Sequence, residues 1–250
     1  MAGKETSIEE LQALIDGSDN IVFFGGAGVS TESGIKDFRS VDGLYHQHYK
    51  YPPETMLSHT FYVDHRQDFF DFYRDKLLMK GQAKVKPNAA HYKLAELEKA
   101  GKLKAIVTQN IDGLHQDAGS ETVYELHGSV LRNYCEHCGK FFDVDYMLKD
   151  DGVPVCDTPG CSGFVKPDVV LYEEGLDNNI MRTAVQAIAN ADMLIIGGTS
   201  LVVYPAAGLI DYYRGNKLVL INRDATARDD VADYCIHGSI GQILSQIEVR

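Results

Sequence analysis

The stretch Ile21-Val22-Phe23-Phe24-Gly25-Gly26-Ala27-Gly28 decides the fold of this chain. Its first half is short and wholly apolar, as expected for a strand of a parallel sheet that is buried on both faces. Its glycine-rich second half lets backbone N–H groups approach a pyrophosphate, and a following helix N-terminus adds positive potential. The dinucleotide fingerprint has glycine where Thr31 stands, so the match is partial, and an ordinary tight turn between strand and helix is the alternative.

The rest of the chain continues an alternation of apolar runs and helical patterns. The capping box Ser7-Ile8-Glu9-Glu10, followed by apolar residues at helical spacing, starts the first helix. Further strands are predicted at 105–107, 123–126, 169–172, 193–196 and 218–221, and further helices at 61–79, 88–100, 179–190, 206–213 and 240–247. Residues 40–60 have no period and are interpreted as a loop. Strands that alternate with helices predict an α/β fold, a Rossmann-like parallel sheet with helices on both faces.

Four cysteines interrupt this alternation in two close pairs, Cys135-x2-Cys138 and Cys156-x4-Cys161. The spacing predicts a four-thiolate zinc site, with two disulfides or scattered core thiols as the alternatives. Four thiolates leave no open position on the ion, so the zinc is expected to be structural. We expect residues 129–168 to form a small zinc-binding domain inserted between residues 1–128 and 169–250 of the Rossmann-like domain, with a second, helical excursion at about 40–80.

Composition and charge indicate which kinds of partner the chain does not bind and in which cellular compartment it works. The chain has 250 residues and a net charge of −12, and an acidic chain repels nucleic acid phosphate, so no nucleic acid partner is expected. No stretch approaches the roughly 18–20 apolar residues that cross a bilayer, and no membrane association is expected. The N-terminus lacks the apolar core of a signal peptide. Together with zinc-bound thiols, this predicts a cytoplasmic protein.

Polar residues of the kind that bind nucleotides follow the predicted strands. Ligands of open parallel sheets bind at the carboxyl ends of the strands. Gln109, Asn110 and Asp112 follow the second strand, where they can hold ribose hydroxyls and a carboxamide, although an Asx-rich turn is the alternative. His127 follows the third strand, in a place suited to a general base, although a lone histidine is more often structural.

Further candidates follow the other strands. Phe38 can stack on a planar ring and Arg39 can pair with phosphate, with a surface ion pair beside a core aromatic as the alternative. Thr199 and Ser200 offer hydroxyls for phosphate or ribose, and Asn222 can bind the far ribose or adenine. Five strand ends with ligand-type residues predict one nucleotide site.

These clusters, in this order, resemble the sirtuin family over roughly residues 8–248. The motifs that carry the resemblance are Gly26-Ala27-Gly28-Val29-Ser30, Asp37-Phe38-Arg39, Thr108-Gln109-Asn110-Ile111-Asp112, His127-Gly128, the four cysteines and Gly198-Thr199-Ser200. The short termini favour a bacterial-type member. The resemblance implies NAD-dependent removal of acyl groups from protein lysines in a cleft between a large and a small domain. NAD is then consumed, and nicotinamide and O-acetyl-ADP-ribose are released.

The resemblance also assigns roles to residues. It implies that His127 is the catalytic base and that acetylated-lysine proteins are the partners. It implies NAD contacts by Ala27, Thr31, Phe38, Arg39, Gln109, Asn110, Ile111, Asp112, His127, Thr199, Ser200, Asn222 and Ile240. It implies that the substrate peptide pairs as an added strand with residues from two segments, Val170 and Tyr172, and Val202 and Val203.

Two departures from the family pattern bear on the substrate. Tyr172-Glu173-Glu174 stands where the family often has Phe-Gly-Glu. Members specialised for acidic acyl groups carry Tyr-x-x-Arg, and here Tyr73 is followed by Lys76, while Thr31 stands where such members usually have alanine. Acetyl or another uncharged acyl group is therefore expected. The alternatives are other acyl groups, mono-ADP-ribosyl transfer to protein, and a nucleotide-sensing module whose zinc ribbon binds DNA.

Overall fold

The computed structural model describes residues 3–38, 43–47, 49–226 and 228–250. Its main feature is a seven-stranded sheet with the order β1-β10-β9-β8-β2-β3-β4. The strands are β1 (Lys4–Glu5), β2 (Ile21–Gly25), β3 (Leu103–Thr108), β4 (Val123–Glu125), β8 (Met193–Gly197), β9 (Leu218–Asn222) and β10 (Tyr234–His237). Every pairing in this sheet is parallel. The strand order reverses between β2 and β8, which is where doubly wound sheets bind ligands.

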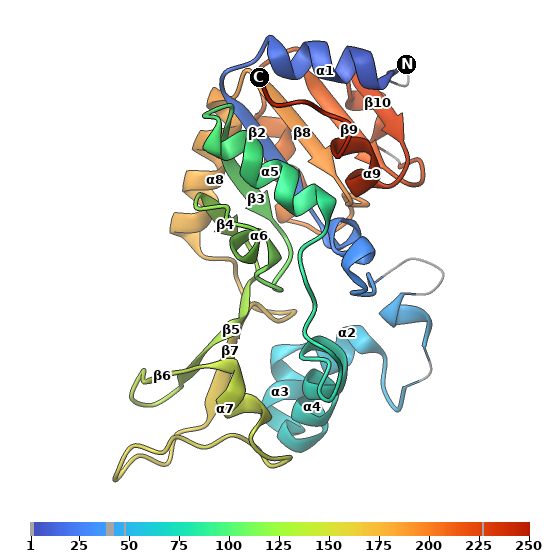
Figure 1. The fold of residues 1–250 in the computed structure, drawn as a ribbon. Helices are drawn as coiled ribbons and strands as arrows, with labels where there is room; N and C mark the ends of the chain where they lie inside the picture. Colours follow the sequence, from blue (N-terminus) through green and yellow to red (C-terminus); the bar gives the residue numbers. More distant parts are fainter. Residues whose placement is uncertain (1–2, 39–42, 48, 227) are drawn as a thin grey trace.

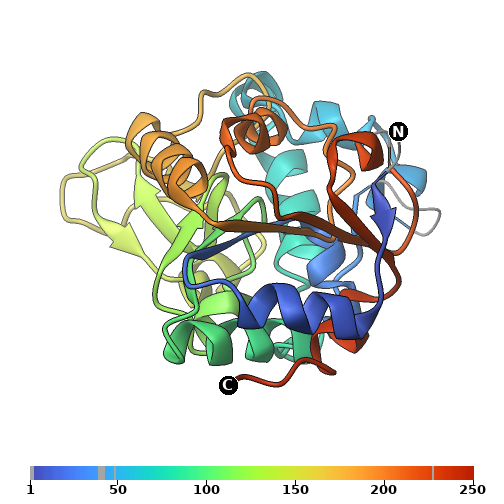
Figure 2. The same cartoon turned by 90° about the horizontal axis from the view of Figure 1, so that it is seen from above.

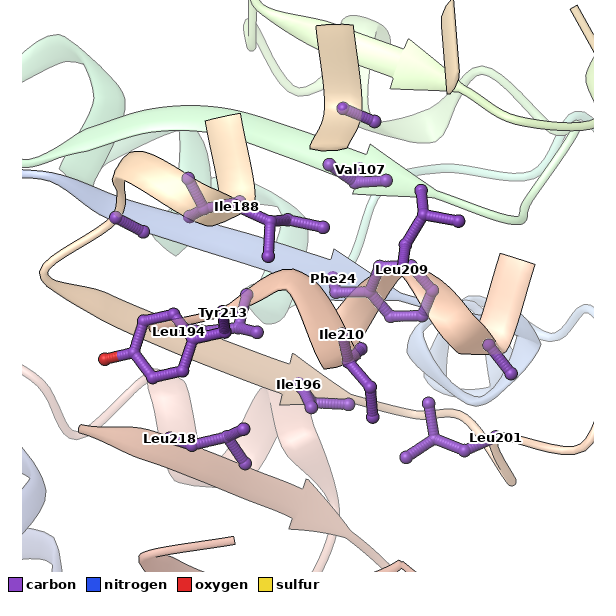
Figure 3. Close-up of a cluster of buried hydrophobic side chains, with 14 of the residues drawn as sticks. Phe24, Val107, Ile188, Leu194, Ile196, Leu201, Leu209, Ile210, Tyr213 and Leu218 are labelled. Carbon is purple, nitrogen blue, oxygen red and sulfur yellow. The ribbon is translucent and has the colours of Figure 1, made fainter. Parts of the chain in front are cut away.

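Helices cover both faces of this sheet, as the sequence predicts. One face carries α1 (Ile8–Asp16), α5 (Ala89–Lys99) and α9 (Ile240–Leu244), and the other carries α8 (Asn178–Asn190) and the 3-10 helix η5 (Ala206–Tyr212), which lie on opposite sides in Figure 2. Residues of β2 alternate between the two cores: Phe24 packs with α8 and η5, whereas Phe23 packs with α1 and α5. Figure 3 shows Phe24 beside Leu209 and Ile210 of η5. We call the sheet and these helices the large lobe.

A small lobe extends from the carboxyl edge of the sheet (Figure 1). Its three-stranded antiparallel sheet has the order β6-β5-β7, formed by β6 (Phe141–Phe142), β5 (Gly128–Cys135) and β7 (Val165–Val169), with α7 (Val144–Leu148) beside it. The small lobe also contains α2 (Pro53–Met56), α3 (His59–Asp64), α4 (Arg66–Phe72) and a π-helical turn η4 (Tyr73–Leu77). We define it as residues 53–77 and 128–169.

The two segments of the small lobe share one core. Tyr62 and Phe69 of the helices pack in the same buried cluster as Phe142 and Met147 of the thiol-containing segment. The buried guanidinium of Arg74 donates to the carbonyl oxygens of Met147 (2.8 Å), Asp151 (3.1 Å) and Gly152 (2.5 Å). The helical excursion and the inserted segment are therefore held together by both packing and hydrogen bonds.

The remaining helices are short and lie at the sheet's carboxyl edge or in connections. They are the 3-10 turns η1 (Ala27–Val29), η2 (Thr31–Ser33), η3 (Leu44–His46) and η6 (Asp229–Val231), and α6 (Leu114–Asp117). No helix in the described ranges is long and apolar enough to cross a membrane.

Two sequence predictions of elements were wrong, and some strands were not predicted. Residues 169–172 were expected to form a strand, but β7 ends at Val169 and belongs to the small antiparallel sheet. Its buried and half-exposed residues alternate, as in a strand with one solvated face. Residues 40–60 were expected to be a loop, yet η3, α2 and the start of α3 lie there; residues 40–42 and 48 are outside the described ranges. The strands β1 and β10 of the large sheet and β5 and β6 of the small sheet were not predicted.

Candidate functional site

A cavity of about 1260 Å³ lies between the carboxyl edge of the large sheet and the small lobe. It is larger than the roughly 300–1,000 Å³ of an ordinary small-molecule pocket. Its wall draws on the segments that follow β2, β3, β4, β8 and β9, which are far apart in sequence. The predicted convergence of these strand ends on one site is therefore found in the fold.

Glycines at the switch point leave bare backbone facing the cavity. Gly28 donates its N–H to the carbonyl of Gly198 at 2.8 Å, and a Cβ on Gly28 would lie 2.8 Å from the Cα of Gly198. Gly198 has φ +60°, and its own Cβ would lie 2.3 Å from the nitrogen of Val29. The two loops can approach this closely only without side chains, and the bare backbone that results suits a pyrophosphate.

A buried polar chain lies beneath the glycine-rich loop. The side-chain amide of Asn110 donates to the Ser30 hydroxyl (3.1 Å), which donates in turn to Oδ2 of Asp112 (2.6 Å). The other oxygen of Asp112 accepts from the backbone N–H of Leu114 at 3.0 Å. Because donors and acceptors are matched along the chain, these side chains present fixed dipoles to the cavity wall they line.

A second network connects three strand ends. Gln109 donates its backbone N–H to Gly25 and its side-chain amide to the Thr199 hydroxyl at 3.1 Å. Asn222 forms a reciprocal pair with the backbone of Thr199: its oxygen accepts the Thr199 N–H (3.0 Å) and its amide donates to the Thr199 carbonyl (2.9 Å). An amide carries two N–H groups, so one N–H of Asn222 has no partner among the described residues.

His127 lies on the cavity wall directly after β4. Its Nδ1 is 2.9 Å from the carbonyl oxygen of Gln109, and because a carbonyl can only accept, Nδ1 carries the proton. Nε2 is then an acceptor with no hydrogen-bond partner among the described residues. Burial lowers the pKa of this imidazole, with the bond to Gln109 acting in the opposite direction, so the neutral form is favoured at neutral pH. This geometry suits a general base.

Two short segments with unpaired backbone groups stand at the mouth of the cavity. Both backbone groups of Tyr172 are already used, since its N–H donates to Leu57 and its carbonyl accepts from His59. The next residue, Glu173, and Val202 on the other segment make no backbone hydrogen bond within the described ranges. Glu173 (φ +76°) and Leu201 (φ +54°) both adopt the left-handed region. An extended peptide can therefore pair with Glu173 and Val202, but not with the backbone of Tyr172.

The four predicted metal ligands converge on one point. The sulfur atoms of Cys135, Cys138, Cys156 and Cys161 all lie within 4.8 Å of one another. The Cys135–Cys161 and Cys138–Cys156 sulfur separations are 3.6 Å, and none of the four thiols is in a disulfide. A tetrahedral ion with Zn–S bonds of about 2.3 Å requires sulfurs about 3.8 Å apart, so the thiols fit zinc. Backbone N–H bonds from Cys138 and His137 lower the pKa of the Cys135 thiol, which favours a thiolate ligand.

The structure gathers nearly all the predicted site residues. Those that line the cavity are Ala27, Thr31, Phe38, Gln109, Asn110, Ile111, Asp112, His127, Thr199, Ser200, Asn222, Ile240, Val170, Tyr172 and Val203. Ile240 is also almost wholly buried in the core of the large lobe. Val202 is exposed and is not part of the cavity wall, and Arg39 lies outside the described residues.

Contacts that support the glycine-rich loop and its neighbours were not predicted. Asn88 donates to the Val29 carbonyl (2.8 Å), and the carboxylate of Glu32 accepts from the Gly241 N–H (2.7 Å). These contacts join segments that are distant in the sequence, so no local pattern indicates them. Ser30 belongs to the glycine-rich motif, but its bond to Asp112 depends on the meeting of two strand ends.

The fold and this site define a doubly wound nucleotide-binding protein with a four-thiolate module. The sequence model of the Sir2 family matches residues 26–205, and the chain belongs to this family. An "NAD-dependent protein deacetylase" of Clostridium acetobutylicum is 62% identical over 243 residues, which cover 96% of this chain and 97% of that relative.

Solved structures agree with this assignment. The crystal structure of a complex between a Sir2 homologue and NAD has a TM-score of 0.86 and 35% sequence identity, and covers 98% of this chain and 94% of that one. The structure of Sir2 bound to acetylated peptide has a TM-score of 0.83 and 36% identity, and covers 96% of both chains.

Proposed function

We propose that this protein is an NAD-dependent protein-lysine deacetylase that releases nicotinamide and O-acetyl-ADP-ribose. The observation that carries the proposal is the placement of His127, which lines the same cavity as the glycine cradle and whose Nε2 has no hydrogen-bond partner among the described residues. The deacetylases and the NAD and acetylated-peptide complexes among its relatives support the same function. A cavity with nucleotide-type loops on one side and a peptide-pairing edge on the other accommodates both substrates.

The chain's own residues would divide the work as follows. The acyl oxygen of the acetyl-lysine would form a bond to the ribose carbon of NAD as the bond from that carbon to nicotinamide breaks. Gln109, Asn110 and Asp112 offer fixed dipoles to the developing charge on that ribose. His127 would accept the proton of a ribose hydroxyl at Nε2, and its Nδ1 bond to Gln109 keeps that tautomer. The hydroxyl oxygen then attacks the acyl carbon; one water is consumed, the carbon–nitrogen bond to lysine breaks, and the acyl group stays on the ribose.

The remaining contacts are proposed from the family resemblance, and most of their residues line the cavity. We assign the pyrophosphate and nicotinamide side to Ala27, Thr31, Phe38 and Ile111, with Arg39 as a further candidate, and the adenosine side to Thr199, Ser200, Asn222 and Ile240. Val170, Tyr172, Val202 and Val203 are assigned to the substrate peptide. Tyr172 would contribute its ring, because its backbone is already paired with α3 and its N-cap region.

The acyl group is proposed to be acetyl or another uncharged group. Tyr73 does not line the cavity, and its hydroxyl is buried. Its ring stacks on that of Phe69, with the two ring centroids 5.7 Å apart. Lys76 lines the cavity, but its ammonium is paired with Asp75 at 2.9 Å. Neither group of this Tyr-x-x-Lys sequence is therefore placed to hold the carboxylate of an acidic acyl chain.

The zinc ion, the domain boundaries and the cellular compartment are also part of the proposal. The zinc ion is held by Cys135, Cys138, Cys156 and Cys161 and takes no part in the reaction, because four thiolates leave it no open position. We propose residues 1–128 and 169–250 as the nucleotide-binding domain and 129–168 as the zinc domain, with the helical excursion packed against the latter. Free thiols of this kind suit a reducing, cytoplasmic setting.

Mass spectrometry of the products from NAD and a panel of acyl-lysine peptides tests the proposal. We expect deacetylated peptide, nicotinamide and O-acetyl-ADP-ribose in equal amounts, and slower reaction with succinyl-lysine than with acetyl-lysine. Faster desuccinylation would reverse the acyl assignment. With NAD labelled in its ADP-ribose part, label that remains on protein instead of in a small product would indicate ADP-ribosyl transfer.

A further inference from the structure

Glu173 has a backbone conformation that residues other than glycine rarely adopt. Its φ of +76° lies in the left-handed region, where residues with a Cβ are strained and glycine is not. It occupies the middle of the sequence Tyr172-Glu173-Glu174, at the mouth of the cavity. Strain of this kind persists only where the surroundings hold the residue in place, so the contacts of Glu173 identify what holds it.

The carboxylate of Glu173 supplies the anchor. Its Oε2 accepts from the Thr60 hydroxyl at 2.7 Å and from the Thr60 backbone N–H at 2.9 Å. Thr60 is in the first turn of α3, where backbone N–H groups have no partner within the helix. The Thr60 hydroxyl and backbone bonds lower the pKa of Glu173, so the carboxylate is ionised at neutral pH.

The neighbours on either side are anchored independently. The backbone of Tyr172 is paired with Leu57 and His59, and the carboxylate of Glu174 accepts from Lys166 (3.1 Å) and from the Leu171 N–H (2.9 Å). Glu173 is thus the one residue of the three whose backbone makes no hydrogen bond within the described ranges. The peptide planes on both sides of Glu173 are held by the bond from His59 to the Tyr172 carbonyl and by the bond from the Glu174 N–H to Leu171 (3.1 Å), and the carboxylate of Glu173 offsets the strain of the left-handed turn between them.

We propose that Glu173 is a positioning residue for the substrate peptide. The two bonds from Thr60 to its carboxylate offset the strain of the left-handed turn, so that the N–H and carbonyl of Glu173 stay aligned to pair with an acyl-lysine peptide across from Val202. This inference rests on the proposed deacetylase function. A glycine would adopt the turn without strain but could not be anchored, and an alanine would have the strain without the anchor.

The test compares variants by their affinity for a neutral acetyl-lysine peptide, measured by calorimetry. Glu173→Ala removes the anchor, Glu173→Gln keeps an oxygen that can accept both Thr60 bonds, and Thr60→Val removes one bond from the other side. Glu121→Ala, an exposed carboxylate away from the cavity, is the matched control. ADP-ribose binding and thermal unfolding are measured in parallel to show that each variant is folded and that its nucleotide side is intact.

We expect Glu173→Ala to weaken peptide binding about five- to tenfold, as for the loss of one to two hydrogen bonds, with ADP-ribose affinity and kcat unchanged. The peptide affinity of Glu173→Gln should stay within about twofold of wild type, and that of Thr60→Val should lie between those of Glu173→Gln and Glu173→Ala. The double variant Thr60→Val, Glu173→Ala should bind the peptide no more weakly than Glu173→Ala alone. The Glu121→Ala control should bind as wild type does.

Two results would overturn the inference. One is unchanged peptide affinity in Glu173→Ala. The other is a loss in Glu173→Gln that appears only with arginine-flanked peptides, because the carboxylate would then act by attracting positive charge and not by holding the turn. Failure of the wild-type protein to bind any acetyl-lysine peptide would instead contradict the proposed function itself.

Discussion

The two lobes reach stability by different physical routes. The central strands of the large lobe, β2, β8 and β9, are buried along their whole length. In the small lobe, buried and more exposed residues are mixed along β5 and β7, and the sulfurs of its four cysteines converge on one point. The large lobe can therefore rely on burial of apolar surface, whereas the small lobe needs an ion and buried hydrogen bonds. The site lies where the two meet.

Removing a metal ligand should have the largest effect, and it should unfold the small lobe while the large lobe stays folded. Cys138→Ala is expected to unfold the small lobe and abolish deacetylation, because a structural zinc contributes on the order of 10 kcal/mol to folding. Limited proteolysis should cut within residues 128–169 while the large lobe stays protected, and zinc content should fall to zero.

Cys235→Ala is the matched control for that experiment. Cys235 is buried in the core of the large lobe and is not among the four converging thiols. Its loss should cost about 1 kcal/mol and leave zinc content and activity intact. A Cys138→Ala protein with full activity would refute the structural role of the metal.

Removing the guanidinium of Arg74 should break the contact between the two segments of the small lobe. Arg74→Met leaves three carbonyl oxygens without their donor, and we expect a loss of roughly 3–5 kcal/mol in the stability of that lobe. Hydrogen exchange would show faster opening of α4 and α7 and unchanged protection of β2 and β8. Arg182→Met, at an exposed position on α8, is the control and should change neither the stability of the small lobe nor the exchange of α4 and α7. Equal loss of protection in both lobes of Arg74→Met would contradict the distinction between the lobes.

A methyl group at the switch point should damage the large lobe instead. In Gly28→Ala the new Cβ would lie 2.8 Å from the Cα of Gly198, so the two loops must separate at a cost of about 1–3 kcal/mol. NAD affinity, measured by calorimetry, should fall while zinc content is unchanged. Gly208→Ala, whose Cβ would lie 3.6 Å from Tyr204, makes only ordinary contact and serves as the control. Normal NAD affinity in Gly28→Ala would show that the loops can accommodate a side chain.

The smallest effect concerns pH. Burial lowers the pKa of His127, so the neutral base should persist to a lower pH than a free imidazole of pKa about 6.5. The acid limb of kcat/KM should therefore have an apparent pKa below 6.5. A limb at or above that value would mean that a protonated form, or another group, controls the reaction.

The large lobe could be predicted from local patterns, and the small lobe only in part. The buried strands 21–24, 105–107, 193–196 and 218–221 are apolar throughout, and the structure has strands at each of them. The thiol spacing indicated the metal site. The shared core of Tyr62 and Met147, and the bonds of Arg74, depend on contacts between distant segments, which no local period encodes.

The site divides in the same way. The residue types at the strand ends indicated where a nucleotide would lie, because parallel strands end at one edge. The role of Ser30 between Asn110 and Asp112 could not be read from the sequence, since it depends on how two loops meet. Tyr172 was predicted to pair with the peptide, but its backbone bonds to Leu57 and His59 arise from packing of the small lobe.

The most direct test of the site is the activity of His127→Ala with NAD and an acetyl-lysine peptide, alongside calorimetry with ADP-ribose. If the neutral imidazole is the base, product formation should fall by at least about 10²- to 10⁴-fold while ADP-ribose still binds. Near-normal release of O-acetyl-ADP-ribose by that variant would contradict the account.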